Sequence, residues 1–293
     1  MQKKILGRYG NDRGHWVGDG FPVRSLFSYT GFGEHLSPFL LLDYAGPHRF
    51  QPTGGRRGVG EHPHRGFETV TIVYDGEVEH RDSSGGGGII GPGDVQWMTA
   101  GRGIQHEEFH SPAYARTGGD FRMVQLWVNL PARDKDTPPA YQTITAANIP
   151  SVALPNDAGT LRVIAGDMGD VHGPARTFSP LNVWDGKLRE GAQASLTLPR
   201  GHNAAIVCLE GRLIVDGQQE LGSAQFVLFD REGEDVTLQA VAATSFLVLT
   251  GEPLNEPVVG YGPFVMNTQE QIRQAIEDLR GGRFGNIRGR QTA

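Results

Sequence analysis

Residues 61–71 read EHPHRGFETVT and carry two histidines, His62 and His64, separated by one residue. The β-branched run that follows predicts a strand here. Alternate side chains of a strand share a face, so His62, His64 and Glu68 can point the same way into a barrel. Two imidazoles on one face suit a borderline metal such as iron, nickel, copper or zinc.

A similar pair occurs about forty residues later, in residues 97–108, which read WMTAGRGIQHEE. His106 and Glu108 share one face of a strand, and Glu107 points the other way. Two such pairs on separate strands of a barrel predict one metal site with four ligands. These ligands are His62, His64, His106 and Glu108.

The metal interpretation competes with a simpler one. A single His-x-His pair is equally typical of hydrogen-bonded histidines in a core, so the first pair alone leaves both open. The second pair favours the metal site. The other histidines have no evident partner at strand spacing, and we expect them at the surface or in turns. They are His15, His35, His48, His80, His110, His172 and His202.

Short apolar runs with strand character fill residues 21–130 and return after about residue 160. The 42 glycines and 18 prolines lie between these runs as turn residues, which is typical of an all-β protein. Residues 129–139 lose the alternation and predict a connection between two β-domains. The clearest runs are residues 39–42, 69–74, 95–98, 121–128, 161–164, 194–198, 204–209, 212–215, 226–229 and 245–249.

Two local patterns predict a turn and a helix. Residues 85–88 are four glycines, which we interpret as a hairpin tip because no helix follows to make a phosphate cradle. Thr268 and Gln271 form a capping-box pattern ahead of apolar residues at 272, 275, 276 and 279. That spacing is one helix face, which we expect to pack on the body of the protein before Gly281 ends the helix.

Bulk composition limits the classes of function. A chain of 293 residues has room for two domains of average size, and its net charge of -6 gives no general attraction for nucleic acid. The single cysteine, Cys208, excludes an intrachain disulfide and is expected in the core, which favours a reducing compartment. No apolar run approaches the length of a membrane span. We expect a cytoplasmic protein with no membrane and no direct nucleic-acid partner.

Three blocks of the chain resemble motifs of the pirin family. Residues 62–70 are similar to the pirin form of the first cupin motif, and residues 92–108 resemble the family's second motif across its whole length. Residues 262–268 and 282–285 resemble the family's C-terminal signature. The resemblance implies an all-β fold of two cupin (jelly-roll) β-barrels, face to face, with a short C-terminal helix.

The resemblance also implies a division of the chain. We expect an N-terminal metal-binding cupin over residues 1–130, a linker over residues 131–140, and a C-terminal cupin over residues 141–293 that ends in the helix. The C-terminal barrel is expected to hold no metal, because His202 stands there without a partner pair.

In the pirin family the counterparts of His62, His64, His106 and Glu108 hold one divalent metal ion. We expect Fe(II), with Ni, Cu, Mn, Co and Zn as alternatives, because histidine and carboxylate ligands accept several metals. Glu68 corresponds to a glutamate that binds the metal in many other cupins but not in pirins. We expect it to lie next to the metal ligands without binding the metal.

Pirins that resemble this chain are associated with quercetin 2,3-dioxygenase activity, in which O2 opens a flavonol with release of carbon monoxide. This implies a flavonol-like substrate, O2, and Glu108 as the catalytic base that takes the substrate's 3-hydroxyl proton. The alternative is a metal- or redox-dependent regulatory protein that binds a protein partner, as other pirins do. A relic cupin that binds metal without turnover is a third interpretation.

Overall fold

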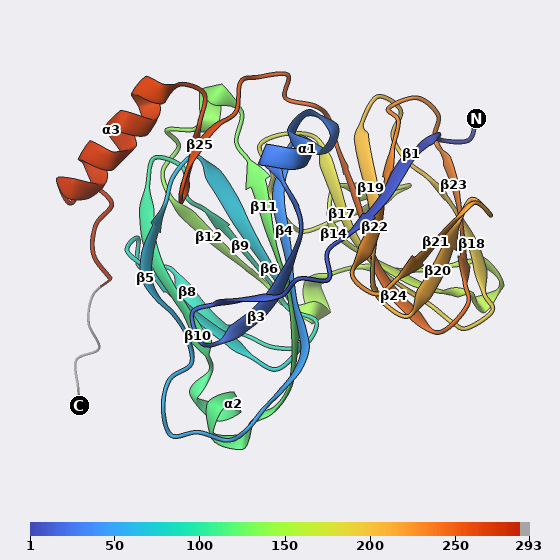
Figure 1. The fold of residues 1–293 in the computed structure, drawn as a ribbon, viewed down its shortest axis with the longest axis horizontal. Coiled ribbons are helices and arrows are strands. Elements are labelled where there is room, and N and C mark those ends of the chain that lie inside the picture. The colour runs from blue at the N-terminus through green and yellow to red at the C-terminus, as the bar shows by residue number, and fades with distance from the viewer. Residues whose placement is uncertain (288–293) are drawn as a thin grey trace. The chain divides into compact units, whose positions relative to one another are not determined.

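The chain is mostly β-structure in a computed structural model that describes residues 1–287 (Figure 1). Its helices are α1 (Tyr29–Leu36), α2 (Pro112–Thr117) and α3 (Gln269–Arg280). Its strands are β1 (Ile5–Gly10), β2 (His15–Val17), β3 (Phe21–Ser28), β4 (Phe39–Phe50), β5 (Gly58–His64), β6 (Phe67–Asp75), β7 (Val78–Asp82), β8 (Gly87–Ile90), β9 (Val95–Thr99), β10 (Ile104–His110), β11 (Gly119–Asn129), β12 (Ala140–Ile144), β13 (Ser151–Ala153), β14 (Gly159–Ala165), β15 (Asp167–Met168), β16 (Val171–His172), β17 (Leu181–Leu188), β18 (Gln193–Thr197), β19 (Asn203–Glu210), β20 (Arg212–Val215), β21 (Gln219–Gly222), β22 (Gln225–Phe229), β23 (Asp235–Ala240), β24 (Thr244–Gly251), β25 (Val259–Tyr261) and β26 (Phe264–Met266). Every strand-like run predicted above lies in, or overlaps, one of these strands.

The chain folds into two compact units, each built from segments that are distant in sequence. Unit 1 comprises residues 1–13, 24–40 and 147–255. Unit 2 comprises residues 14–23 and 41–146 together with the segment that begins at Glu256.

Unit 2 contains both predicted histidine pairs. A four-stranded sheet has the order β5-β10-β7-β8, and a seven-stranded sheet has the order β12-β9-β6-β11-β4-β3-β2. Part of its core is a cluster of aromatic rings, with the Phe121 ring centroid 5.9 Å from that of Phe21 and 5.7 Å from that of Phe50. The two sheets are the two layers of a jelly roll, with apolar side chains filling the space between them.

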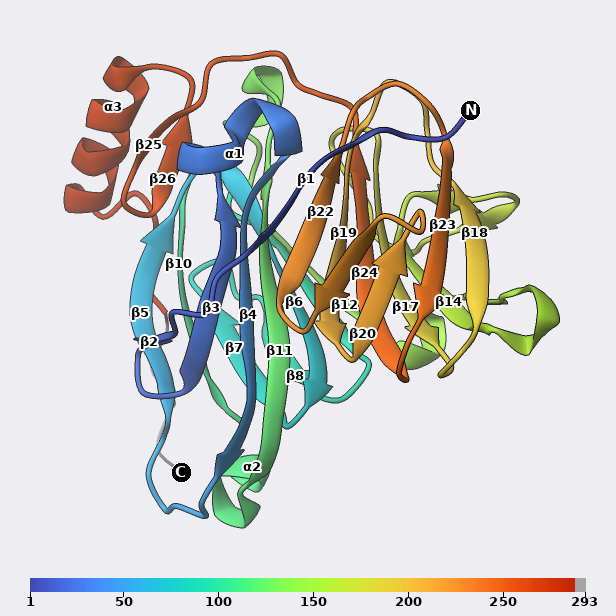
Figure 2. The ribbon, with the colours of Figure 1, turned by 45° about the vertical axis from the view of Figure 1, so that its right-hand side comes forward.

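Unit 1 repeats this plan. Its seven-stranded sheet has the order β1-β22-β19-β24-β17-β14-β13, and its four-stranded sheet has the order β18-β23-β20-β21. Figure 2 shows β22, β19 and β24 side by side. The predicted core position of Cys208 is confirmed: the side chain is fully buried, and burial raises the pKa of its thiol to about 12.

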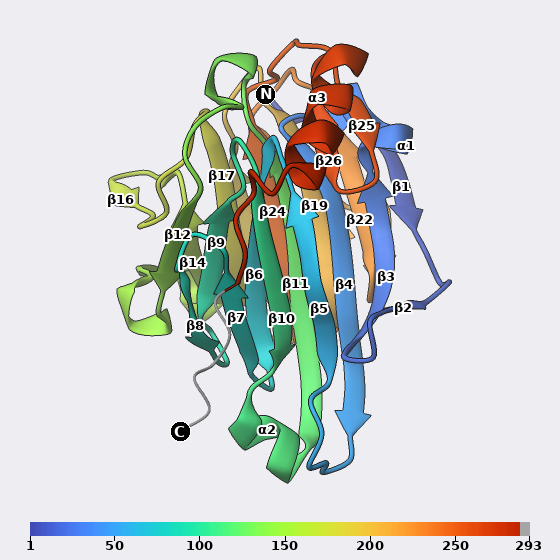
Figure 3. The ribbon, with the colours of Figure 1, turned by 90° about the vertical axis from the view of Figure 1, so that its left-hand side faces the viewer.

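The boundaries of the units correct the division expected from the sequence. The first strand, β1, pairs with β22 and so belongs to unit 1, whereas α3 packs on β25 and β26 in unit 2 (Figure 3). The expected linker, residues 131–140, already ends in β12, which pairs with β9. Backbone pairing decides which unit a strand joins, and alternation along the chain does not reveal a strand's partner.

The predicted turn and helix are confirmed. The glycine run closes the antiparallel hairpin of β7 and β8. Helix α3 starts at a complete capping box of Thr268 and Gln271, and it buries Ile272 and Ala275. Among the described residues, no helix is long and apolar enough to cross a membrane.

Candidate metal centre

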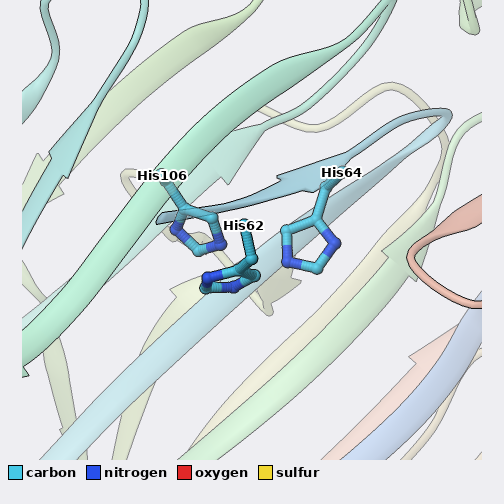
Figure 4. A group of neighbouring side chains, drawn as sticks. All are labelled: His62, His64 and His106. Atoms are coloured by element: carbon cyan, nitrogen blue, oxygen red, sulfur yellow. The ribbon is translucent and has the colours of Figure 1, made fainter. Parts of the chain in front are cut away.

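Strands β5 and β10 bring three histidines together. The strands pair antiparallel, with His106 opposite His62 and Ile104 opposite His64. His62 and His64 share a face because they are two positions apart on β5. The ring centroid of His106 lies 4.2 Å from that of His62 and 4.8 Å from that of His64, and the three rings lie close together (Figure 4).

The three imidazoles fit a metal ion. One ring nitrogen from each lies within 4.8 Å of the others, and burial lowers the pKa of His64 to about 3 and that of His106 well below its usual value. Both rings are therefore neutral at pH 7, the form that binds metals. Among the described residues, His106 Nε2 is buried with no hydrogen-bond partner. Buried nitrogens without a partner are uncommon in proteins, and one that lies beside two other imidazoles fits a metal ion.

Glu108, the fourth predicted ligand, is buried on β10 and belongs to a second group of candidate ligand atoms, with His106 and His80. Its carboxylate is held by two amides: Gln96 Nε2 donates to Oε1 at 3.2 Å, and Gln125 Nε2 donates to Oε2 at 3.1 Å. Thr71 Oγ1 orients the second amide by donating to Gln125 Oε1 at 2.6 Å. These contacts fix the direction of the carboxylate.

Glu107 points away from this group, as predicted, and forms ion pairs with Arg56 and Arg81. A register shift between His106 and Glu108 marks a bulge in the pairing of β10 with β5. Bulges re-aim side chains at functional sites.

Two histidines expected at the surface or in turns are buried instead. His80 is fully buried beside His106, and the buried His110 donates from Nε2 to Gly20 O at 2.9 Å. The sequence did contain a signal for His80, because Asp82 lies two positions on along the same strand and shares its face. His15, His35 and His172 are exposed, as expected.

Glu68 does not point toward the histidines, and this corrects its expected position next to the metal ligands. Gly66, at φ +87, lies in the turn between β5 and β6. The alternation of side-chain faces therefore does not continue from His64 to Glu68. Glu68 lies on the face of β6 opposite to Thr71, which faces the Glu108 site. There it accepts a hydrogen bond from Thr99 Oγ1 at 2.8 Å.

A cavity of about 460 Å³ opens beside these residues in unit 2. His62, His64 and Glu108 all line it, so the candidate ligands face a space that can hold a small organic molecule. Apolar side chains form most of the remaining wall. The other lining residues are Val17, Phe21, Val23, Asp43, Val59, Gly60, Glu61, Met123, Gln125 and Trp127.

Two cupin barrels, one of which holds a cluster of histidines beside a cavity, define a bicupin. Residues 20–128 match the model of the family described as Pirin, and residues 183–285 match the Pirin C-terminal cupin domain. The chain belongs to the pirin family, as its motifs predicted.

Relatives and solved structures agree with this assignment. The chain is 62% identical, over 96% of its length and 98% of the relative's, to a Pseudomonas aeruginosa protein named "Putative quercetin 2,3-dioxygenase". It is 37% identical to human pirin, over 86% of this chain and 84% of that one. A crystal structure of quercetin 2,3-dioxygenase from Acinetobacter baumannii matches with a TM-score of 0.96 and 58% identity, over 98% of this chain and all (100%) of that one.

Proposed function

We propose that this protein is a metal-dependent dioxygenase that opens flavonol-type substrates with O2. The observation that carries the proposal is a cluster of three histidines, two of which, His62 and His64, line a largely apolar cavity of about 460 Å³ together with Glu108. The names of the relatives supply the reaction, because a pirin fold by itself serves more than one function.

The proposed ligands of the metal are His62, His64, His106 and Glu108. Fe(II) is the metal we propose, and the same nitrogen and oxygen donors also suit Ni, Cu, Mn, Co and Zn. When bound, the metal supplies Lewis-acid and redox chemistry toward O2 and the substrate's oxygens.

The cavity wall is the proposed binding surface for the flavonol rings. Phe21, Met123 and Trp127 offer apolar area against which a planar aromatic molecule packs and from which water is excluded. Three further polar side chains, Asp43, Glu61 and Gln125, line the wall beside the proposed ligands, where substrate hydroxyl groups would lie near them.

Glu108 is the proposed base. Within residues 1–287, its Oε2 accepts one hydrogen bond, from the cavity-lining Gln125, and therefore retains a lone pair for the proton of the substrate's 3-hydroxyl group. In the Glu108→Gln variant, we expect turnover to fall by at least about a hundredfold, the usual contribution of a general base. Metal content, measured on the same preparation, should stay close to that of the wild type because the three histidines remain. Unchanged turnover would remove the base assignment.

The deciding experiment is O2 uptake and carbon monoxide release after quercetin is added to protein loaded anaerobically with Fe(II). The His64→Ala variant is the control, because it loses a proposed ligand and leaves the cavity wall otherwise intact. Turnover by the wild type that disappears in the control supports the proposal. No uptake by protein shown to hold its metal would overturn it in favour of the regulatory, partner-binding alternative.

A further inference from the structure

A buried chain of side chains continues from His106 away from the cavity. His80 Nδ1 lies 3.3 Å from His106 Nδ1, and His80 Nε2 lies 3.1 Å from Asp82 Oδ2. All three side chains are buried. Strand β7 places them there, because it pairs with β10 in a register that sets Asp82 opposite His106 and His80 opposite Glu108.

The protons in this chain can be assigned from a neighbouring amide, that of Gln96. A carboxylate only accepts hydrogen bonds, so the Gln96 atom 3.2 Å from Glu108 Oε1 must be the NH2 group. The Tyr141 hydroxyl supports this orientation by lying 3.1 Å from the opposite atom, Gln96 Oε1. The Gln96 NH2 group therefore acts as a hydrogen-bond donor to each acceptor beside it.

The same NH2 group lies 3.1 Å from His80 Nδ1, which must accept a hydrogen bond from it. A neutral imidazole carries its proton on one nitrogen, so the proton of His80 is on Nε2 and is donated to Asp82 Oδ2. Asp82 is itself held in place through Oδ1, which accepts from the Ser84 and Gly86 backbone N–H groups at 2.8 and 3.0 Å.

His106 must then carry its proton on Nδ1. His80 Nδ1 offers one lone pair, which the Gln96 NH2 group and His106 Nδ1–H share at 3.1 and 3.3 Å; a lone pair on His106 Nδ1 would instead face that of His80 and repel it. This leaves the lone pair of His106 on Nε2, the buried nitrogen without a partner in the described structure. That nitrogen is the one free for the cluster with His62 and His64.

We propose that Asp82, His80 and Gln96 are positioning residues that hold His106 in the Nδ1–H tautomer, with Nε2 ready to bind the metal. The proposal rests on the proposed metal site and adds the groups that orient one of its ligands. Residues that hydrogen-bond a ligating histidine raise its basicity and fix its ring, and losing them weakens metal binding by about 10- to 100-fold. Tyr141 completes the arrangement by stacking on His80, with ring centroids 4.9 Å apart.

The direct test is 15N NMR of the histidine side chains in the full-length protein at pH 7.5, before and after loading with Zn(II). We expect His106 to be the Nδ1–H tautomer and His80 the Nε2–H tautomer before the metal is added. An Nε2–H tautomer of His106 would overturn the proposal. Failure of Zn(II) to shift the signals of His62, His64 and His106 would instead overturn the proposed metal site, so the two failures are distinct.

The His80→Phe variant tests the consequence. It keeps a buried ring but offers no acceptor, so we expect mixed tautomers of His106 and a Zn(II) Kd raised about 10- to 100-fold. The matched control is His110→Phe, which removes another buried imidazole of unit 2 that contacts Gly20 and not His106. We expect its Zn(II) Kd to be that of the wild type. Weaker binding in His80→Phe with an unchanged His106 tautomer would show a merely structural role and contradict the proposal.

Discussion

Glu68 is a carboxylic acid buried on β6, with an exposed fraction of 1%. Burial raises its pKa to about 7, and the hydrogen bond from Thr99 offsets only part of this effect. In the unfolded chain the group ionises near its usual pKa of 4.5. The folded protein therefore holds a proton on Glu68 between about pH 4.5 and 7 that the unfolded chain has lost.

This difference predicts how stability depends on pH. The folded state binds the extra proton, so the contribution of Glu68 is most favourable below pH 4.5 and declines as pH rises to about 7. In the Glu68→Gln variant, which stays neutral, we expect a free energy of unfolding higher than the wild type's by up to about 3 kcal/mol at pH 8. The gain should vanish below pH 4.5.

Chemical denaturation at several pH values checks this expectation. Glu190→Gln, which neutralises an exposed carboxylate, is the control and should show no such pH-dependent gain. A gain for Glu68→Gln that is equal at pH 4 and pH 8 would contradict the assigned role of ionisation.

At the level of elements, the C-terminal segment packs on the two motifs that carry the histidines. Phe264 forms a β-bridge with Arg65, which directly follows His64. The Arg65 guanidinium also forms an ion pair with Asp278 of α3, with 2.5 Å between Nη1 and Oδ2. The ring of Phe284 covers Gly103, where a Cβ atom would lie 2.2 Å from it. The family's C-terminal signature is therefore part of the structure that supports β5 and β10.

The Phe284→Ala variant tests this packing. Removing a buried aromatic ring usually lowers the free energy of unfolding by about 3 to 5 kcal/mol. Here we expect the loss to make α3 and the start of β10 unfold locally more often. Hydrogen exchange of amides at Gln105 and Ile272 should become faster. The control is Tyr261→Ala, an exposed ring on the same segment that should leave both amides unchanged. Slower or unchanged exchange at Gln105 in Phe284→Ala would show that the segment does not support β10.

At the scale of the whole molecule, both groups of candidate metal ligands lie in unit 2. A ligand stabilises whatever must unfold to release it, by about 2.7 kcal/mol at a free concentration one hundred times its Kd. We expect Fe(II), added without oxygen, to increase hydrogen-exchange protection in β6, β10 and β11 more than in β19 and β24 of unit 1.

A chelator should reverse this increase, and the His64→Ala variant should lack it. Equal protection of both units would contradict the expected pattern and would show that they unfold as one cooperative body.

The sequence determined the family, the β-rich fold and the three histidines, because alternation along a strand and the spacing of His62, His64 and His106 are local properties. The capping box of α3 was predictable for the same reason. The sequence interpretation was wrong where the outcome depended on contacts between distant segments. The direction of Glu68 depends on the turn at Gly66, and the burial of His80 depends on the pairing of β7 with β10.

Only the tertiary structure decided which unit each end of the chain joins and which side chains stand behind the histidines. Strand β1 and helix α3 each pack with residues more than two hundred positions away, as β1 does with β22 and as Asp278 does with Arg65. Backbone hydrogen bonds and side-chain packing select these partners in space, and no periodic pattern along the chain encodes them. The sequence thus indicates which groups can bind a metal, whereas the fold determines where these side chains point and which of their atoms carry protons.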